Sequence, residues 1–145
     1  MPVSPGLSVD LFNTSISLLS APMQTKYRSG VGNLTYAMQD TRPDIAYSVS
    51  LLSRFLAAPT DQHYALLIRI LKYLNTYLSL SIQYRRSADQ GLICYTDTIW
   101  GDKIILHNSK STAGCILFFA GGALLWSFKR MPTPAISTME AEYRS

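Results

Sequence analysis

Apolar positions in the first half of the chain recur with the period of an α-helix. From Lys26 onward, Tyr27, Val31, Leu34 and Met38 fall on one helical stripe. Two glycines interrupt this stretch, and each costs about 1 kcal/mol relative to alanine unless close packing requires it. The pattern therefore predicts a first helix from about residue 26, preceded by a flexible lead over residues 1–25 that is rich in proline and polar residues.

A second helix is predicted from Thr41, which is a suitable cap. Pro43 fits the first helical turn, and Asp44 favours the positive end of the helix dipole. The helix is expected to end before Pro59. Its apolar side chains share one face: Ile45, Val49, Leu52 and Leu56.

A third helix is predicted from Thr60-Asp61. Arg69 and Lys72 fall on the face opposite its apolar stripe. Such a charged face is either simply solvated or follows a phosphate backbone, and the pattern leaves both open. The apolar stripe itself consists of Tyr64, Leu67, Ile68, Leu71, Leu74 and Leu78.

The period then changes to two, which indicates strands. Leu80 to Tyr84 reads as a short half-exposed strand. Three strands are predicted further on: Leu92 to Asp97, apolar on both faces and therefore expected to be central and buried, and two hairpin strands. The hairpin strands are Cys115–Ala120 and Ala123–Phe128, joined by a turn at Gly121-Gly122.

These elements predict an α+β chain with two folded parts. Residues 26–88 form a helical module with a short strand, and residues 89–145 form a strand-rich module. The latter has three antiparallel strands followed by the start of a helix. A polar run, Arg85–Asp89, marks the boundary between the two parts.

Two carboxylates stand out in the second part. Asp97 ends a strand, and Glu140 lies on the predicted final helix, three residues after Ser137. A carboxylate at the end of a buried strand is costly unless it is paired, protonated or bound to metal. Carboxylates on two separate elements can converge on a divalent cation, but Glu140 also fits a capping box with Ser137.

Composition narrows the classes of function. The 145 residues are 48% hydrophobic and 15% charged, with a net charge of +4, which permits a polyanionic partner without requiring one. Cys94 and Cys115 lie in apolar strand segments, so they are predicted to be buried free thiols in a reducing, intracellular compartment. They form no Cys-x-x-Cys pair, so no structural zinc site is expected. His63 and His107 are predicted to be surface residues. No apolar run is long enough to cross a membrane, and no signal peptide is predicted.

Several motifs together resemble the Ty1/copia-type retrotransposon Pol polyprotein. The first part resembles the connection region after its reverse transcriptase, and the second part resembles the start of its ribonuclease H domain. The motifs of the first part are Tyr27-Arg-Ser-x-Val-Gly-x-Leu-x-Tyr36, Thr41-Arg-Pro-Asp-Ile-Ala-Tyr47, Ser53-Arg-Phe55 and Arg69-Ile-Leu-Lys-Tyr-Leu74. Those of the second part are Tyr95-Thr-Asp97, Lys110-Ser-Thr-x-Gly114, Trp126-Ser127 and Glu140-Ala-Glu-Tyr143.

The resemblance implies a ribonuclease H-like fold in residues 89–145 and Mg²⁺-dependent hydrolysis of the RNA strand in RNA–DNA hybrids. Asp97 and Glu140 match the acidic residues that bind the metal ions and act in catalysis. The residues expected to contact nucleic acid are Lys110, Ser111, Thr112, Arg69 and Lys72. The rest of the polyprotein would be a further partner.

Departures from the family pattern limit this expectation. The usual Asp-Ala-Asp-Trp is Asp97-Thr-Ile-Trp100 here, and there is no Tyr-x-Asp-Asp polymerase motif. The chain also stops within the first ribonuclease H helix, before the later acidic residues. We therefore expect the isolated chain to be an inactive fragment of the polyprotein. Two alternative functions stay open: a non-catalytic nucleic-acid-binding module, or a decayed transposon relic without function. In the fold that the resemblance implies, a parallel strand that follows the first helix lies beside the strand Leu92 to Asp97. Without that neighbour this strand becomes an exposed apolar edge, so residues 89–145 alone are expected to be poorly soluble.

Overall fold

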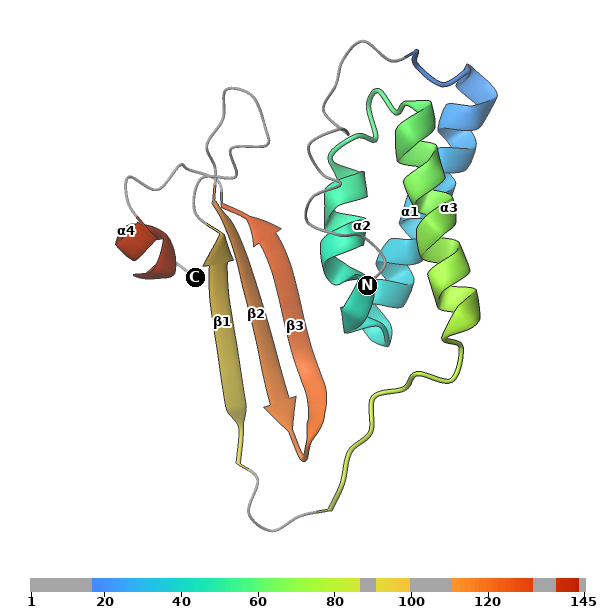
Figure 1. Ribbon diagram of the computed structural model, residues 1–145. Coiled ribbons are helices and arrows are strands. Elements are labelled where there is room, and N and C mark those ends of the chain that lie inside the picture. Colours follow the sequence, from blue (N-terminus) through green and yellow to red (C-terminus); the bar gives the residue numbers. More distant parts are fainter. Residues whose placement is uncertain (1–16, 87–90, 100–110, 132–137, 144–145) are drawn as a thin grey trace. The chain divides into compact units, whose positions relative to one another are not determined.

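A computed structural model describes residues 17–86, 91–99, 111–131 and 138–143. The chain divides into two compact units, Met1–Ser81 and Ile82–Ser145 (Figure 1). The first contains helices and the second a three-stranded antiparallel sheet followed by a short helix. The predicted α+β architecture is therefore confirmed.

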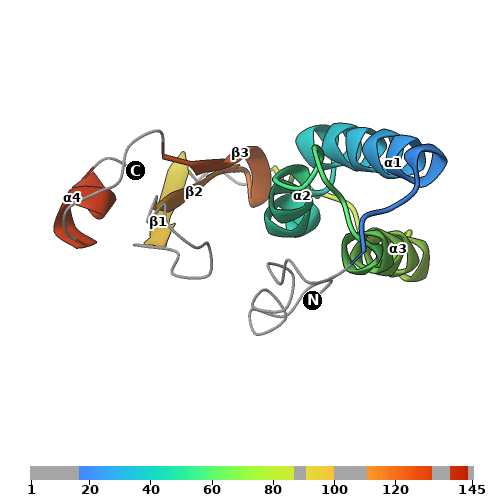
Figure 2. The ribbon, with the colours of Figure 1, turned by 90° about the horizontal axis from the view of Figure 1, so that it is seen from above.

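Three helices pack against one another in the first unit (Figure 2): α1 (Ala21–Asp40), α2 (Ala46–Ser53) and α3 (Asp61–Thr76). A single 3-10 turn, η3 (Pro43–Ile45), leads into α2. The helices enclose one hydrophobic core, because each turns an apolar face toward the other two. Its buried members are Leu19, Tyr27, Val31, Leu34, Ile45, Val49, Leu51, Leu52, Leu66, Leu67 and Ile70.

The stripe predicted for α1 is confirmed, but the helix begins earlier than residue 26. Tyr27, Val31 and Leu34 are buried, whereas the helix starts at Ala21 with Pro22 in its first turn. Proline fits there because the first helical N–H groups have no partner within the helix. The preceding segment also contributes to the core, since Leu19 is buried and its N–H donates to the Pro59 carbonyl at 3.0 Å.

Helix α3 begins where the sequence predicts, with Thr60 as its N-cap, but His63 is not a surface residue. Only 2% of His63 is exposed, and its ring stacks on Phe55 with centroids 3.9 Å apart. Its Nδ1 accepts a hydrogen bond from the Thr60 N–H at 2.9 Å. His63 thus fills the position that Glu or Gln takes in an ordinary capping box.

The buried face of α3 also differs from the prediction. His63, Leu66, Leu67 and Ile70 are buried, an arc rotated away from the predicted stripe. Of the residues assigned to that stripe, Leu67 is buried, whereas Leu71 and Leu78 are exposed and the others only partly buried.

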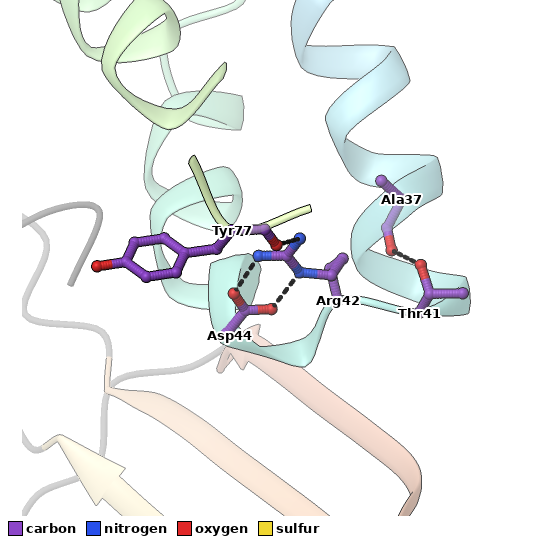
Figure 3. A network of polar contacts seen from close by, with 5 residues as sticks. All are labelled: Ala37, Thr41, Arg42, Asp44 and Tyr77. Atoms are coloured by element: carbon purple, nitrogen blue, oxygen red, sulfur yellow. Dashed lines mark hydrogen bonds and ion pairs between the residues drawn. The ribbon is translucent and has the colours of Figure 1, made fainter. Parts of the chain in front are cut away.

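The start of the second helix is organised by an ion pair and not by Thr41. The Arg42 guanidinium donates to both carboxylate oxygens of Asp44 at 2.9 and 2.8 Å and to the Tyr77 carbonyl at 3.1 Å (Figure 3). Thr41 instead donates back to the Ala37 carbonyl of α1. Arg42 therefore ties the start of η3 to the end of α3.

The segment from Leu80 to Tyr84 is not a strand in the structure. Within the second unit, Tyr84 and the following Arg85 are hydrogen-bonded to the hairpin that joins β2 and β3. The Tyr84 hydroxyl donates to the Ala123 carbonyl at 2.7 Å, and the Arg85 N–H donates to the Ala120 carbonyl at 2.8 Å. We call residues 83–85 the strap.

The sheet consists of β1 (Ile93–Ile99), β2 (Thr112–Phe119) and β3 (Gly122–Arg130), in the order β1-β2-β3. The predicted two-residue hairpin is present but shifted by one residue. Its turn is Ala120-Gly121, and both have positive φ, 50° and 78°. Gly122 is the first residue of β3, and a larger residue would not fit there, because a Cβ would lie 2.7 Å from the Tyr84 ring of the strap.

Strand β1 is not the buried central strand that its composition predicts. Among the described strands β2 is central and β1 lies at the edge, with Leu92 62% and Tyr95 59% exposed. The exposed apolar edge expected for Leu92 to Asp97 is thus present. Helix α4 (Thr138–Tyr143) contacts β1 and lies beside its C-terminal end (Figure 1).

Candidate functional site

Asp97 lies near the end of β1, opposite Gly114 of β2. It shares a face of the sheet with Ile93 and Tyr95, and its side chain is exposed. Its Oδ1 accepts a hydrogen bond from the N–H of Thr98 at 2.9 Å. The sequence predicts that Asp97 ends a buried strand and needs a cation or another partner to offset its loss of hydration. The structure contradicts this reason, because Asp97 is exposed to solvent.

Glu140 lies in the first turn of α4 and is half-buried. Because α4 contacts β1, the structure brings together the two elements that carry Asp97 and Glu140. The alternative role of Glu140, in a capping box, depends on Ser137, which lies outside the described residues. The structure thus shows contact between the two elements, and a metal site shared by Asp97 and Glu140 stays a prediction.

The chemistry of the two carboxylates suits a hard cation such as Mg²⁺, which prefers oxygen ligands. In the described ranges, no three His, Cys, Asp or Glu side chains gather into a cluster that could hold a metal ion. The described part of the chain thus supplies two carboxylates on neighbouring elements and no third ligand beside them. Their role as metal ligands stays a prediction.

The residues predicted to contact nucleic acid fall into two groups. Arg69 and Lys72 are exposed and three residues apart on α3, so they lie on one helix face. Ser111 and Thr112 are buried at the start of β2, and the Ser111 carbonyl accepts the N–H of Met131 at 2.8 Å. Lys110 lies outside the described residues. Contact of any of them with nucleic acid stays a prediction.

Two ionisable groups of the first unit are shifted by their surroundings. The hydrogen bond with Arg42 holds the pKa of the Asp44 carboxyl below its usual value, and the same contact raises the pKa of Arg42. Burial raises the pKa of the Tyr27 phenol, which donates to the Leu52 carbonyl at 2.8 Å. Both sets of contacts join helices to one another, so we assign them to stability and not to a site.

The two cysteines are free, as predicted, but they are not buried. Cys94 is exposed, Cys115 is half-buried, and their sulfur atoms are 3.6 Å apart. The sequence contains no local signal for this proximity, because the residues are 21 positions apart and meet only through the register of β1 and β2. The two thiols meet because of the register in which β1 and β2 pair, and the hydrophobic period of each strand does not determine that register.

Within the part of the chain that the structure describes, no helix is long and apolar enough to cross a membrane.

Comparison with known proteins identifies relatives over most of the chain. It is 38% identical over 138 residues to the retrovirus-related Pol polyprotein from transposon TNT 1-94 of Nicotiana tabacum. It is 37% identical over 145 residues to that from transposon RE1 of Arabidopsis thaliana. A secreted RxLR effector protein 161 of Plasmopara viticola is 34% identical over 117 residues, which are 81% of each chain. No family model and no solved structure matches the chain.

The chain belongs to the Ty1/copia-type retrotransposon Pol polyproteins. The matched residues cover 94% and 99% of this chain in the two Pol polyproteins above. They span only 10% and 9% of the length of those polyproteins. The chain therefore corresponds to a segment of a copia-type polyprotein.

Proposed function

We propose that this segment comprises the connection region after the reverse transcriptase and the first part of the ribonuclease H domain. In the parent polyprotein, Asp97 and Glu140 bind Mg²⁺ for hydrolysis of RNA in RNA–DNA hybrids. One observation supports this most directly: α4 lies beside β1, so Glu140 and the exposed Asp97 are on adjoining elements.

The two carboxylates would bind cations, and the bound cations would allow both carboxylates to stay ionised side by side. Two neighbouring carboxylates repel each other, and a bound cation would compensate that repulsion. Asp97 and Glu140 would hold Mg²⁺ through their carboxylate oxygens, and the metal would supply activation of water and stabilisation of the leaving oxygen. The contribution of this chain is to place two oxygen donors on a strand and a helix of one unit.

We further propose that a protein consisting of these 145 residues alone does not cleave hybrids. The described residues offer two carboxylates and no third metal ligand beside them. Cleavage would then require ligands from other segments of the polyprotein. Detectable Mg²⁺-dependent cleavage by the pure chain, lost in Asp97→Asn, would contradict this part of the proposal.

Calorimetric titration of Mg²⁺ and Mn²⁺ into the purified chain tests the metal site. We expect binding heat that both Asp97→Asn and Glu140→Gln remove. Asp61→Asn is the matched control, because Asp61 is an exposed carboxylate on α3 and should leave the heat unchanged. Equal heats from a folded wild type and both site variants would overturn the assignment of these two ligands.

A second candidate function is nucleic-acid binding without cleavage, favoured by the exposed face of α3 that carries Arg69 and Lys72. Cations that neutralise phosphates give an affinity that falls with salt, with a log–log slope of about −0.9 per contact on duplex DNA. Hybrid binding by Arg69→Ala/Lys72→Ala should be weaker and less salt-dependent. Lys26→Ala, which removes an exposed charge from α1, is the control. Unchanged binding in the double variant would exclude this face.

A further inference from the structure

Two thiols meet on one face of the sheet. Cys94 of β1 pairs with Leu117, and Cys115 of β2 pairs with Thr96. The cysteines are therefore diagonal neighbours, and since Cys115 and Leu117 are two residues apart, both thiols project to the same face. Their sulfur atoms lie 3.6 Å apart, so the side chains already converge.

Both thiols are accessible enough to react with a small oxidant. Cys94 is exposed and Cys115 is half-buried. A hydrogen bond joins the two sulfur atoms, and this contact raises the pKa of the Cys115 thiol. Because Cys94 is exposed and Cys115 only half-buried, solvent reaches both sulfur atoms, whereas buried structural thiols are usually inert.

We propose that Cys94 and Cys115 form an oxidative modification site, at which a peroxide converts the two thiols into a disulfide within one chain. A disulfide requires a sulfur separation of about 2 Å, so the sulfur atoms must approach by roughly 1.5 Å. Staggered χ1 rotations move a sulfur atom by distances of this order. Among the described strands β1 lies at the edge of the sheet, so such an adjustment displaces none of them on its other side.

The reaction balances with one molecule of hydrogen peroxide. The thiol of Cys94, the more exposed of the two, loses its proton and attacks the peroxide. Its sulfur is oxidised to a sulfenic acid, and the O–O bond breaks to release hydroxide, which takes up the proton from Cys94 as the first water. The Cys115 sulfur then attacks the sulfenic sulfur. The S–S bond forms, the S–O bond breaks, and the departing hydroxide takes the Cys115 proton as water. In total, two thiols and one peroxide give a disulfide and two waters.

This site is separate from the candidate metal site. Cys94 and Asp97 are three residues apart on β1 and so project to opposite faces of the sheet. The effect of the disulfide would be mechanical, because it links the exposed edge strand β1 covalently to the central β2. Closing the chain between residues 94 and 115 restricts the unfolded state and raises stability if the native geometry is kept.

The direct test uses the wild-type chain and needs no variant. The reduced protein is treated with one equivalent of hydrogen peroxide, unfolded, and exposed to N-ethylmaleimide before intact-mass measurement. We expect a monomer that has lost two hydrogens and carries no alkyl group, with one peptide pair linked through residues 94 and 115. Full alkylation of both cysteines, or disulfides only between chains, would overturn the proposal.

Matched variants and a stability measurement complete the test. Cys94→Ser and Cys115→Ser should give no monomeric cross-link and should end as higher sulfur acids or dimers. The denaturant midpoint of the wild type should rise on oxidation and return with dithiothreitol, while that of Cys94→Ser should not respond. A single-cysteine variant showing the same loss of two hydrogens, or a wild-type midpoint that does not rise, would refute the proposal.

Discussion

At the scale of single residues, Tyr27 joins two helices through one polar atom in an apolar core. The residue is fully buried on α1, and its hydroxyl donates to the Leu52 carbonyl of α2. That carbonyl also accepts the Phe55 N–H at 3.1 Å. Loss of the tyrosine hydroxyl would therefore not leave the carbonyl without a partner.

Tyr27→Phe is expected to lower the free energy of unfolding by about 1 kcal/mol, the typical net worth of a hydrogen bond when ring packing is kept. Urea denaturation of the full chain measures this. Tyr36→Phe is the control, because Tyr36 lies on the same helix and is 72% exposed. Equal losses in the two variants would show that the buried bond has no special role.

The ion pair of Arg42 and Asp44 predicts a loss of stability in acid. The folded-state pKa of Asp44 lies below its unfolded value because Arg42 donates to the carboxylate. Its contribution is therefore complete above about pH 4, the unfolded pKa, and is lost as the pH falls through the folded pKa. Asp44→Asn should remove this part of the acid dependence.

We expect Asp44→Asn to cost about 1 kcal/mol at neutral pH, since the pair is bidentate and only partly exposed. The measurement is unfolding free energy at several pH values between neutrality and pH 3. Asp40→Asn, at the exposed end of α1, is the control. If the wild type and Asp44→Asn lose stability in parallel below pH 4, Asp44 is not the group responsible.

His63 shows why residue roles are harder to predict than helix positions. Thr60-Asp61 is a helix start that the sequence predicts correctly, but an ordinary capping box has Glu or Gln at its third residue. Here the imidazole of His63 takes that place and stacks on Phe55. His63 is therefore buried by its contacts with Thr60 and Phe55, which the period of apolar residues does not predict.

At the scale of elements, the two glycines of α1 have different roles. A Cβ at Gly30 would lie 2.8 Å from a methyl group of the buried Leu67, whereas a Cβ at Gly32 would meet nothing within 4 Å. Gly30 thus permits close approach of α1 and α3. Gly32 has no such packing role in the structure.

Gly32→Ala should stabilise the chain by about 1 kcal/mol through helix propensity and a less flexible unfolded state. Gly30→Ala should instead give a net loss of about 1 kcal/mol, because overpacking against Leu67 outweighs the same gain. Thermal unfolding of the two variants makes the comparison, each serving as the control for the other. Stabilisation by both would show that α1 and α3 are not in close contact at Gly30.

Strand β1 illustrates the limit of pattern reading at the element scale. Alternation predicts the three strands and the hairpin close to their observed positions, because side-chain direction depends only on the local backbone. Burial of a strand depends on its neighbours. Leu92, just before β1, and Tyr95 within it are apolar yet exposed, because strand side chains point to the faces of a sheet and are buried only where another element covers that face.

At the scale of the whole molecule, apolar burial is unequal between the two units. Among the described residues, all eleven buried members of the hydrophobic core belong to the first unit. In the described part of the second unit, the buried apolar side chains are Ala123 and Met131. A sheet with so little buried apolar area has few of the contacts that make a fold stable by itself.

Expressed separately, a fragment of residues 17–81 should be monomeric and should unfold cooperatively. A fragment of residues 82–145 should aggregate, because the exposed apolar edge of β1 can pair with other chains. Circular dichroism with thermal unfolding and size-exclusion chromatography distinguish the two outcomes. A monodisperse, cooperatively unfolding 82–145 fragment would contradict the second expectation.

The candidate metal site was predictable in part. The strand and helix positions of Asp97 and Glu140 follow from local pattern, and the family match adds their chemical role as a proposal. The exposure of Asp97 was not predictable, because it depends on which strands flank β1. Whether the two carboxylates bind one cation is a matter for calorimetry.

The strap over the hairpin has a consequence for amide hydrogen exchange. The Arg85 N–H is bonded to the Ala120 carbonyl although it belongs to no helix or strand, so its hydrogen should exchange slowly with solvent deuterium. In Gly122→Ala the added methyl group would collide with the Tyr84 ring and displace the strap. The Arg85 amide should then exchange at the rate of an open loop, so this one hydrogen reports whether the strap is closed.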